Sequence, residues 1–70
     1  MPIINVSIRS GRDQEQLNDL MRALHDATKE VLGTADNNIR VLLHEIEGEH
    51  WMSGRVTLAE MSRANADPTR

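Results

Sequence analysis

The stretch that decides the fold is "IINVSIRSGRDQEQLNDLMRALHDATKEVLGTADNNIRVLLHEI", residues 3–46, because its hydrophobic period changes twice. Residues 3–9 alternate, with Ile4, Val6 and Ile8 on one side, which is typical of a β-strand with one covered face. Residues 14–32 instead repeat apolar side chains every three or four positions, which predicts an amphipathic helix. Residues 39–46 are apolar on both sides in their middle, which indicates a second, centrally placed strand.

Short polar segments separate these three elements. Gly11 supplies a turn after the first strand, and Asp13 with Gln16 three residues later resembles a helix capping box. Gly33 is a typical helix stop signal. Strand, long helix and strand in this order predict a βαβ unit, in which the two strands are parallel and the helix covers one face of the sheet. The fold class is therefore α/β.

The rest of the chain predicts a small addition to this unit. A short strand or β-hairpin is expected near Arg55–Leu58, after the turn around the only tryptophan. Residues 61–70 are polar and contain Pro68, which predicts a loosely ordered C-terminal tail or an arm across a neighbouring subunit. The 70 residues allow one domain, residues 1–70.

The composition predicts an oligomer. The chain has no cysteine, phenylalanine or tyrosine and a single tryptophan, so neither disulfides nor large aromatic side chains stabilise its core. One helix covers one face of a two-stranded parallel sheet, whereas such sheets are normally covered on both faces. We therefore expect the sheets to pair between subunits.

Composition also excludes several partners. The net charge of −3 gives no support for nucleic-acid binding, and no apolar run is long enough for a membrane span, so a cytoplasmic protein is expected. The three histidines, His25, His44 and His50, are too scattered for a metal site. Neither a metal nor another cofactor is expected.

Pro2 raises a chemical possibility. If the initiator methionine is removed, Pro2 carries a free secondary amine; otherwise it is an ordinary residue at the start of a strand. Parallel strands start at the same edge, so Pro2 and Arg40 lie together. Arg9 and Arg12 then lie roughly 25–30 Å away, at about 3.3 Å per residue. An Arg9 or Arg12 that serves a Pro2 must therefore belong to a neighbouring subunit.

The chain resembles the 4-oxalocrotonate tautomerase family over nearly its whole length. The resemblance is carried by Pro2, Gly11-Arg12, Arg40, Glu45 and Trp51. It implies a single tautomerase-like domain, a dimer of paired sheets and usually a homo-hexamer, a trimer of dimers. It also implies a cofactor-independent isomerase that interconverts enol and keto forms of a 2-oxo or 2-hydroxydienoic acid. Pro2 is then the general base, and Arg12 and Arg40 bind and polarise the carboxylate substrate.

Two positions leave alternatives open. Trp51 either packs on the substrate and excludes water or anchors a subunit interface. Arg9 replaces the family's usual apolar residue and resembles the alpha subunit of trans-3-chloroacrylic acid dehalogenase, where two arginines bind the substrate carboxylate. This favours hydration or dehalogenation of an unsaturated or 3-haloacrylic acid as an alternative, although Ser53 stands where that enzyme has its water-activating glutamate. A non-catalytic subunit of a hetero-hexamer is a further alternative.

Overall fold

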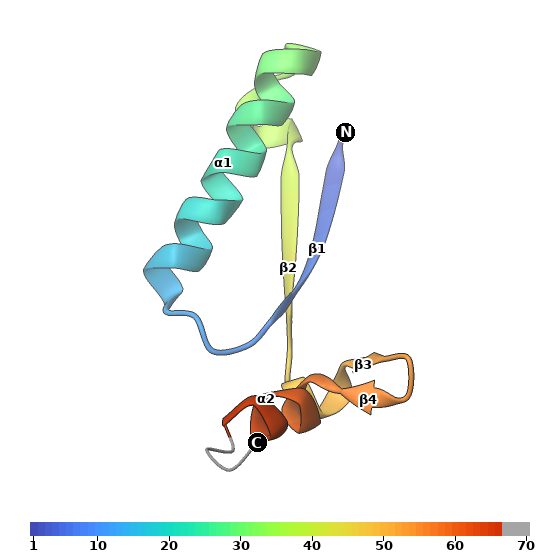
Figure 1. The fold of residues 1–70 in the computed structure, drawn as a ribbon. Helices are drawn as coiled ribbons and strands as arrows, with labels where there is room; N and C mark the ends of the chain where they lie inside the picture. The colour runs from blue at the N-terminus through green and yellow to red at the C-terminus, as the bar shows by residue number, and fades with distance from the viewer. Residues whose placement is uncertain (67–70) are drawn as a thin grey trace.

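The computed structural model describes residues 1–66 as a βαβ unit followed by a small C-terminal extension (Figure 1). In chain order the elements are β1 (Ile3–Arg9), α1 (Gln14–Leu32), the 3₁₀ turn η1 (Asp36–Asn38), β2 (Arg40–Ile46), the 3₁₀ turn η2 (Gly48–His50), β3 (Met52–Ser53), β4 (Val56–Thr57) and α2 (Leu58–Ala66).

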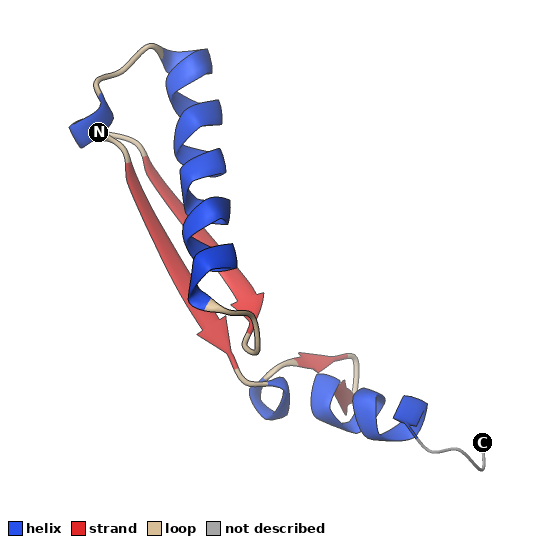
Figure 2. Cartoon of the chain, turned by 90° about the vertical axis from the view of Figure 1, so that its left-hand side faces the viewer, coloured by secondary structure: helices blue, strands red, loops and turns tan. Residues whose placement is uncertain are grey.

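The two long strands pair in parallel, as the strand–helix–strand order predicts. The register aligns Ile3 with Arg40 at one end and Arg9 with Ile46 at the other. Helix α1 lies along one face of this sheet (Figure 2). The side chains that are half-buried on this face alternate along both strands, namely Ile4, Val6, Ile8, Val41 and Leu43. The period-two pattern of residues 3–9 therefore identified the covered face correctly.

Helix α1 begins and ends where its capping residues predict. The Asp13 carboxylate accepts a hydrogen bond from the Gln16 backbone N–H at 2.8 Å, which satisfies a free donor of the first turn. At the other end Gly33 adopts the left-handed conformation, with φ of 67°, and its N–H donates to the Lys29 carbonyl. The helix runs from residue 14 to residue 32, as predicted.

The predicted hairpin is present. Strands β3 and β4 pair Met52 with Thr57 and Ser53 with Val56, and the turn between them contains Gly54 with φ of 66°. The predicted region, residues 55–58, therefore contains the second strand of the hairpin and the first residue of α2.

The prediction of a loosely ordered tail from residue 61 is wrong for residues 61–66, which belong to α2. The Thr57 hydroxyl accepts a hydrogen bond from the Glu60 N–H at 3.1 Å, and the Glu60 carboxylate accepts one from the Thr57 N–H at 2.8 Å. This reciprocal pair is a capping box, which starts a helix despite the polar composition that follows. Residues 67–70, with Pro68, lie outside the described residues.

The chain buries very little of itself. Of the apolar side chains that the structure describes, Leu17 and Ile39 are buried, with 2% and 7% exposed. The radius of gyration is 16.4 Å, whereas a compact chain of this length has roughly 11 Å. The exposed surface is 5408 Å², against roughly 4400 Å² for a compact monomer of this mass. The hairpin and α2 extend beyond the βαβ unit and account for the elongated shape (Figure 2).

The sheet face opposite α1 is open in the single chain. Ile3 and Leu42 lie on this face, with 57% and 47% of their surfaces exposed. Exposed apolar side chains on a regular sheet face are typical of a protein interface. The shape, the small core and this face together support the predicted oligomer.

Substitution of Leu42 by lysine tests the open face. We expect Leu42→Lys to dissociate the oligomer to single chains of 7.9 kDa, because a subunit interface there would bury an unpaired charge. The measurement is native mass by light scattering. Ala23→Lys, on an exposed position of α1, is the matched control and should leave the mass unchanged. An unaltered mass for Leu42→Lys would place the interface elsewhere.

The capping box of α2 predicts a pH dependence. The backbone N–H and the hydroxyl of Thr57 both donate to Glu60 and hold its pKa below the usual 4.5. A carboxyl whose pKa is lower in the folded state stabilises that state at higher pH, and this contribution is lost as the pH falls through the folded pKa. We expect the protection of the α2 amides, relative to the intrinsic exchange rate at each pH, to decrease as the pH falls below 4.5. Glu60→Gln should remove this pH dependence; an identical profile in both proteins would contradict the assignment.

Candidate functional site

Pro2 and Arg40 lie side by side at one end of the sheet. The Pro2 carbonyl accepts a hydrogen bond from the Arg40 backbone N–H at 3.0 Å. Pro2 directly precedes Ile3, which is aligned with Arg40 in the first residue pair of the sheet. Pro2 is half-buried and Arg40 is exposed. Figure 2 shows the N-terminus beside the segment that enters β2. The prediction that parallel pairing brings these two residues together is confirmed.

The connection before β2 positions Arg40. The Arg40 guanidinium donates to the Asn37 backbone carbonyl at 2.7 Å, so it folds back over η1. The neighbouring Ile39 is 7% exposed and anchors the start of the strand in the small core. Arg40 is thus held by a buried neighbour and by a hydrogen bond to the turn.

The same connection is tied to the last turns of α1 by charges. The Asp36 carboxylate lies 2.7 Å from Lys29 Nζ and 3.4 Å from His25 Nε2. The hydrogen bond and charge of Lys29 hold the pKa of Asp36 below its usual value, and Asp36 raises the pKa of Lys29. The His25 side chain is 26% exposed, and its Nδ1 also lies 2.9 Å from the Asp26 carboxylate. These contacts join α1 to the turn that precedes Arg40.

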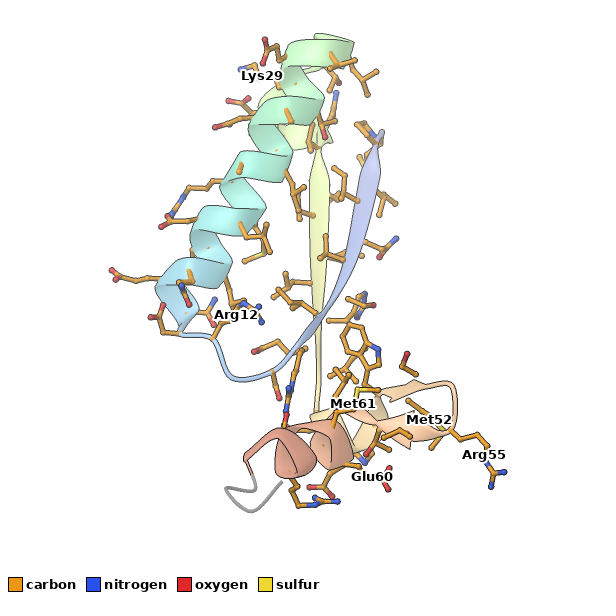
Figure 3. The ribbon with its side chains drawn as sticks, in the orientation of Figure 1. Arg12, Lys29, Met52, Arg55, Glu60 and Met61 are labelled. Carbon is orange, nitrogen blue, oxygen red and sulfur yellow. The ribbon has the colours of Figure 1, made fainter. Side chains whose placement is uncertain are left out.

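Arg9 and Arg12 lie at the opposite end of the sheet. The Ser10 N–H donates to the Ile46 carbonyl at 2.9 Å, which continues the parallel pairing into the turn. The Arg12 guanidinium donates to the Arg9 carbonyl at 3.2 Å, so the two residues are neighbours. Arg12 lies between the first turn of α1 and the strands (Figure 3). It lines a shallow hollow with Ile8, Gln16, Leu17, Asp19 and Leu20.

Trp51 belongs to this same end of the molecule. It follows η2, is half-buried, and its carbonyl accepts a hydrogen bond from the Leu58 N–H at 2.8 Å. Arg9 is also half-buried, and its guanidinium lies against Gly48 and the beginning of α2. The contact between Gly48 and Arg9 joins positions 39 residues apart and has no local sequence signal.

The five candidate residues therefore form two groups in one chain. Pro2 and Arg40 lie at the start of the parallel strands, whereas Arg9, the last residue of β1, lies with Arg12 and Trp51 at the opposite end. The full length of β1, seven residues, separates them. Within the described residues there is no group of three or more side chains suited to hold a metal ion. No helix of the described part is long and apolar enough to cross a membrane.

The chain thus combines a parallel βαβ unit, a proline before β1, arginines at both sheet ends and one uncovered sheet face. The model of the tautomerase enzyme family matches residues 2–61, and the chain belongs to this family. It is 38% identical over 56 residues to a probable tautomerase of Staphylococcus epidermidis, covering 80% of this chain and 92% of that protein. The chain is thus an isomerase-type enzyme of the tautomerase superfamily.

Solved structures support the same assignment. TomN, a 4-oxalocrotonate tautomerase homologue of the tomaymycin biosynthetic pathway, is 32% identical, with a TM-score of 0.87 over 93% of this chain and all (100%) of that one. A heterohexamer 4-oxalocrotonate tautomerase from Chloroflexus aurantiacus is 28% identical, with a TM-score of 0.81, covering 87% of this chain and 98% of that chain. The predicted family and the predicted βαβ fold with a C-terminal hairpin are both confirmed.

Asp36→Asn tests whether the charged contacts fix the turn before Arg40. We expect faster amide exchange at residues 37–40, because the ion pair with Lys29 is lost. In the wild type the same loosening should appear on acidification, since Asp36 has a lowered pKa and loses its charge as the pH falls through that value. Asp19→Asn breaks a comparable exposed ion pair with Arg22 on α1 and serves as the control. Equal exchange in both variants would show that Asp36 does not order the turn.

Proposed function

We propose that this enzyme interconverts the enol and keto forms of a 2-oxo acid or 2-hydroxydienoic acid, with Pro2 as general base. The observation that carries the proposal is the adjacency of Pro2 and Arg40, which are joined by a backbone hydrogen bond of 3.0 Å. A base and a cation at one sheet end match the two requirements of enolisation: a group that moves the proton and a group that stabilises the oxygen anion.

The proposed base requires a free Pro2 nitrogen, and therefore removal of Met1. A free amino terminus titrates near about 7.7–8.0, and a secondary amine is intrinsically more basic. Burial and nearby cations both disfavour the charged form and lower such a pKa. Pro2 is half-buried and Arg40 is its neighbour across the sheet. Both effects favour a neutral amine near physiological pH, which is the form that accepts a proton.

Each residue then has a defined role in the proton transfer. The Pro2 nitrogen takes the proton from the enol hydroxyl, and the same proton is returned to a carbon of the conjugated system. Arg40 stabilises the negative charge that develops on the oxygen. The Arg12 guanidinium binds a substrate carboxylate in bidentate geometry, through two parallel hydrogen bonds. Trp51 packs on the unsaturated substrate and excludes water.

The site is completed by a neighbouring subunit. Arg9, Arg12 and Trp51 of one chain cannot reach its own Pro2, since β1 lies between them. The open sheet face with Ile3 and Leu42 supports pairing of sheets between chains, and we propose a homo-hexamer or a hetero-hexamer with a related chain. The Chloroflexus aurantiacus relative is a heterohexamer, so this family includes assemblies of more than one chain type.

One observation favours a second reaction. Arg9 and Arg12 lie at the same end of the sheet. Two guanidinium groups suit a substrate that is bound mainly through its carboxylate. This arrangement favours addition of water to an unsaturated acid, with loss of halide from a 3-haloacrylic acid. Glu47 and Glu49 are both exposed near this end, and one of them would have to activate the water.

Pro2→Ala tests the proposed base. We expect kcat/KM for ketonisation of 2-hydroxymuconate to fall about 100- to 10,000-fold, because general-base catalysis is lost. The intact mass of the wild type should show that Met1 is absent. A protein that keeps one residue before Pro2 is the matched control, and it should lose activity to the same extent while retaining its native mass. Full turnover in either protein would exclude Pro2 as the base.

The same proteins distinguish the alternatives. Halide release from 3-chloroacrylate by the wild type, without ketonisation of 2-hydroxymuconate, would favour the hydration reaction. Activity in neither assay, with Met1 retained, would favour a non-catalytic subunit.

A further inference from the structure

Gly48 differs from the other three of the four glycines. Gly11, Gly33 and Gly54 have positive φ angles, and no atom lies within 4 Å of the position that a Cβ would occupy. Their backbone conformations explain the choice of glycine. Gly48 has no positive φ, so its backbone accepts an alanine without strain. A Cβ at this position would instead make tight contacts with its neighbours.

The space beside Gly48 is occupied by Arg9 and by the first turn of α2. A Cβ on Gly48 would lie 3.1 Å from Arg9 Nη2, 3.3 Å from Arg9 Nε and 3.2 Å from the Ala59 backbone nitrogen. The guanidinium therefore lies directly against the η2 backbone, closer than it could lie against any residue with a side chain. Gly48 is the surface on which the end of the Arg9 side chain rests.

The charge of Arg9 is available at this position. Within the described part of the chain, the Arg9 guanidinium forms no ion pair with a carboxylate. Arg12 lies beside Arg9 and donates to its carbonyl. A half-buried cation with no anion of its own favours an anionic ligand.

We propose that Gly48 is a positioning residue for Arg9: its missing side chain lets the guanidinium lie against η2, where Arg9 binds the substrate carboxylate. The proposal rests on the proposed function, because it assumes that this end of the sheet receives a carboxylate. It adds a residue that touches no substrate and determines substrate specificity through Arg9.

Gly48→Ala is the direct test, with the saturated dicarboxylate adipate as the probe and calorimetry as the measurement. We expect the Kd for adipate to rise about tenfold, because a charge-assisted hydrogen bond is lost when the guanidinium is displaced. For 2-hydroxymuconate, KM should rise by the same factor while kcat changes less than about twofold, since a contact with the carboxylate stabilises the bound ground state and the transition state equally. Dimethyl adipate, which lacks the charge, should show no difference between the two proteins.

The Ala59 contact requires a second variant. Alanine at position 48 also approaches the Ala59 nitrogen, so a loss of binding could come from displacement of α2. In Arg9→Met, a further Gly48→Ala change should leave the Kd for adipate unaltered if Gly48 acts through Arg9. A tenfold effect that persists without Arg9 overturns the proposal, and so does unchanged binding in Gly48→Ala alone.

Two controls separate this proposal from the proposed function. Arg55→Met removes one positive charge from the exposed hairpin turn, where Arg55 points away from the rest of the molecule (Figure 3), and should not change adipate binding. The Arg9 Nε–H resonance, assigned by its absence in Arg9→Met, should shift in Gly48→Ala even without a ligand. If the wild type does not bind adipate, the carboxylate site of the proposed function fails, and an unshifted resonance would overturn the positioning role independently.

Discussion

The parallel pairing of β1 with β2 is the constraint on which the rest of the structure depends. It places Pro2 beside Arg40 at one end of the sheet. Arg9 and Arg12 then lie at the opposite end. The start and the end of β1 lie at opposite ends of the sheet. The two groups of polar residues are therefore separated by the length of β1. A site that uses both groups must therefore lie between subunits.

The same pairing explains why the single chain has a small hydrophobic core and a large exposed surface. Parallel strands joined by one helix leave a sheet face uncovered, and here that face presents Ile3 and Leu42. Only Leu17 and Ile39 are buried among the described apolar side chains, so the chain lacks the buried surface that stabilises larger domains. The proposed assembly and the proposed shared active site thus have one cause: the uncovered face needs a partner, and a partner is required to supply arginines to Pro2.

The C-terminal segment illustrates where composition misleads. Residues 61–66 are polar and were predicted to be loosely ordered, yet α2 extends through them because Thr57 and Glu60 form a capping box. The sequence contains this signal as "TLAE", residues 57–60. A local hydrogen-bonding motif at the start of a segment was therefore more informative than the average polarity of the residues after it.

By itself, the sequence determined the elements of the βαβ unit and their order, because the periods of residues 3–9 and 14–32 and the caps at Asp13 and Gly33 are interactions between near neighbours along the chain. It also determined, through the parallel βαβ rule, which sheet end receives Pro2 and Arg40 and which receives Arg9 and Arg12. The tertiary structure alone decided the contacts of Arg9 with Gly48 and of Asp36 with Lys29 and His25. These contacts depend on side-chain positions set by packing between separate elements, and no periodicity or spacing encodes them.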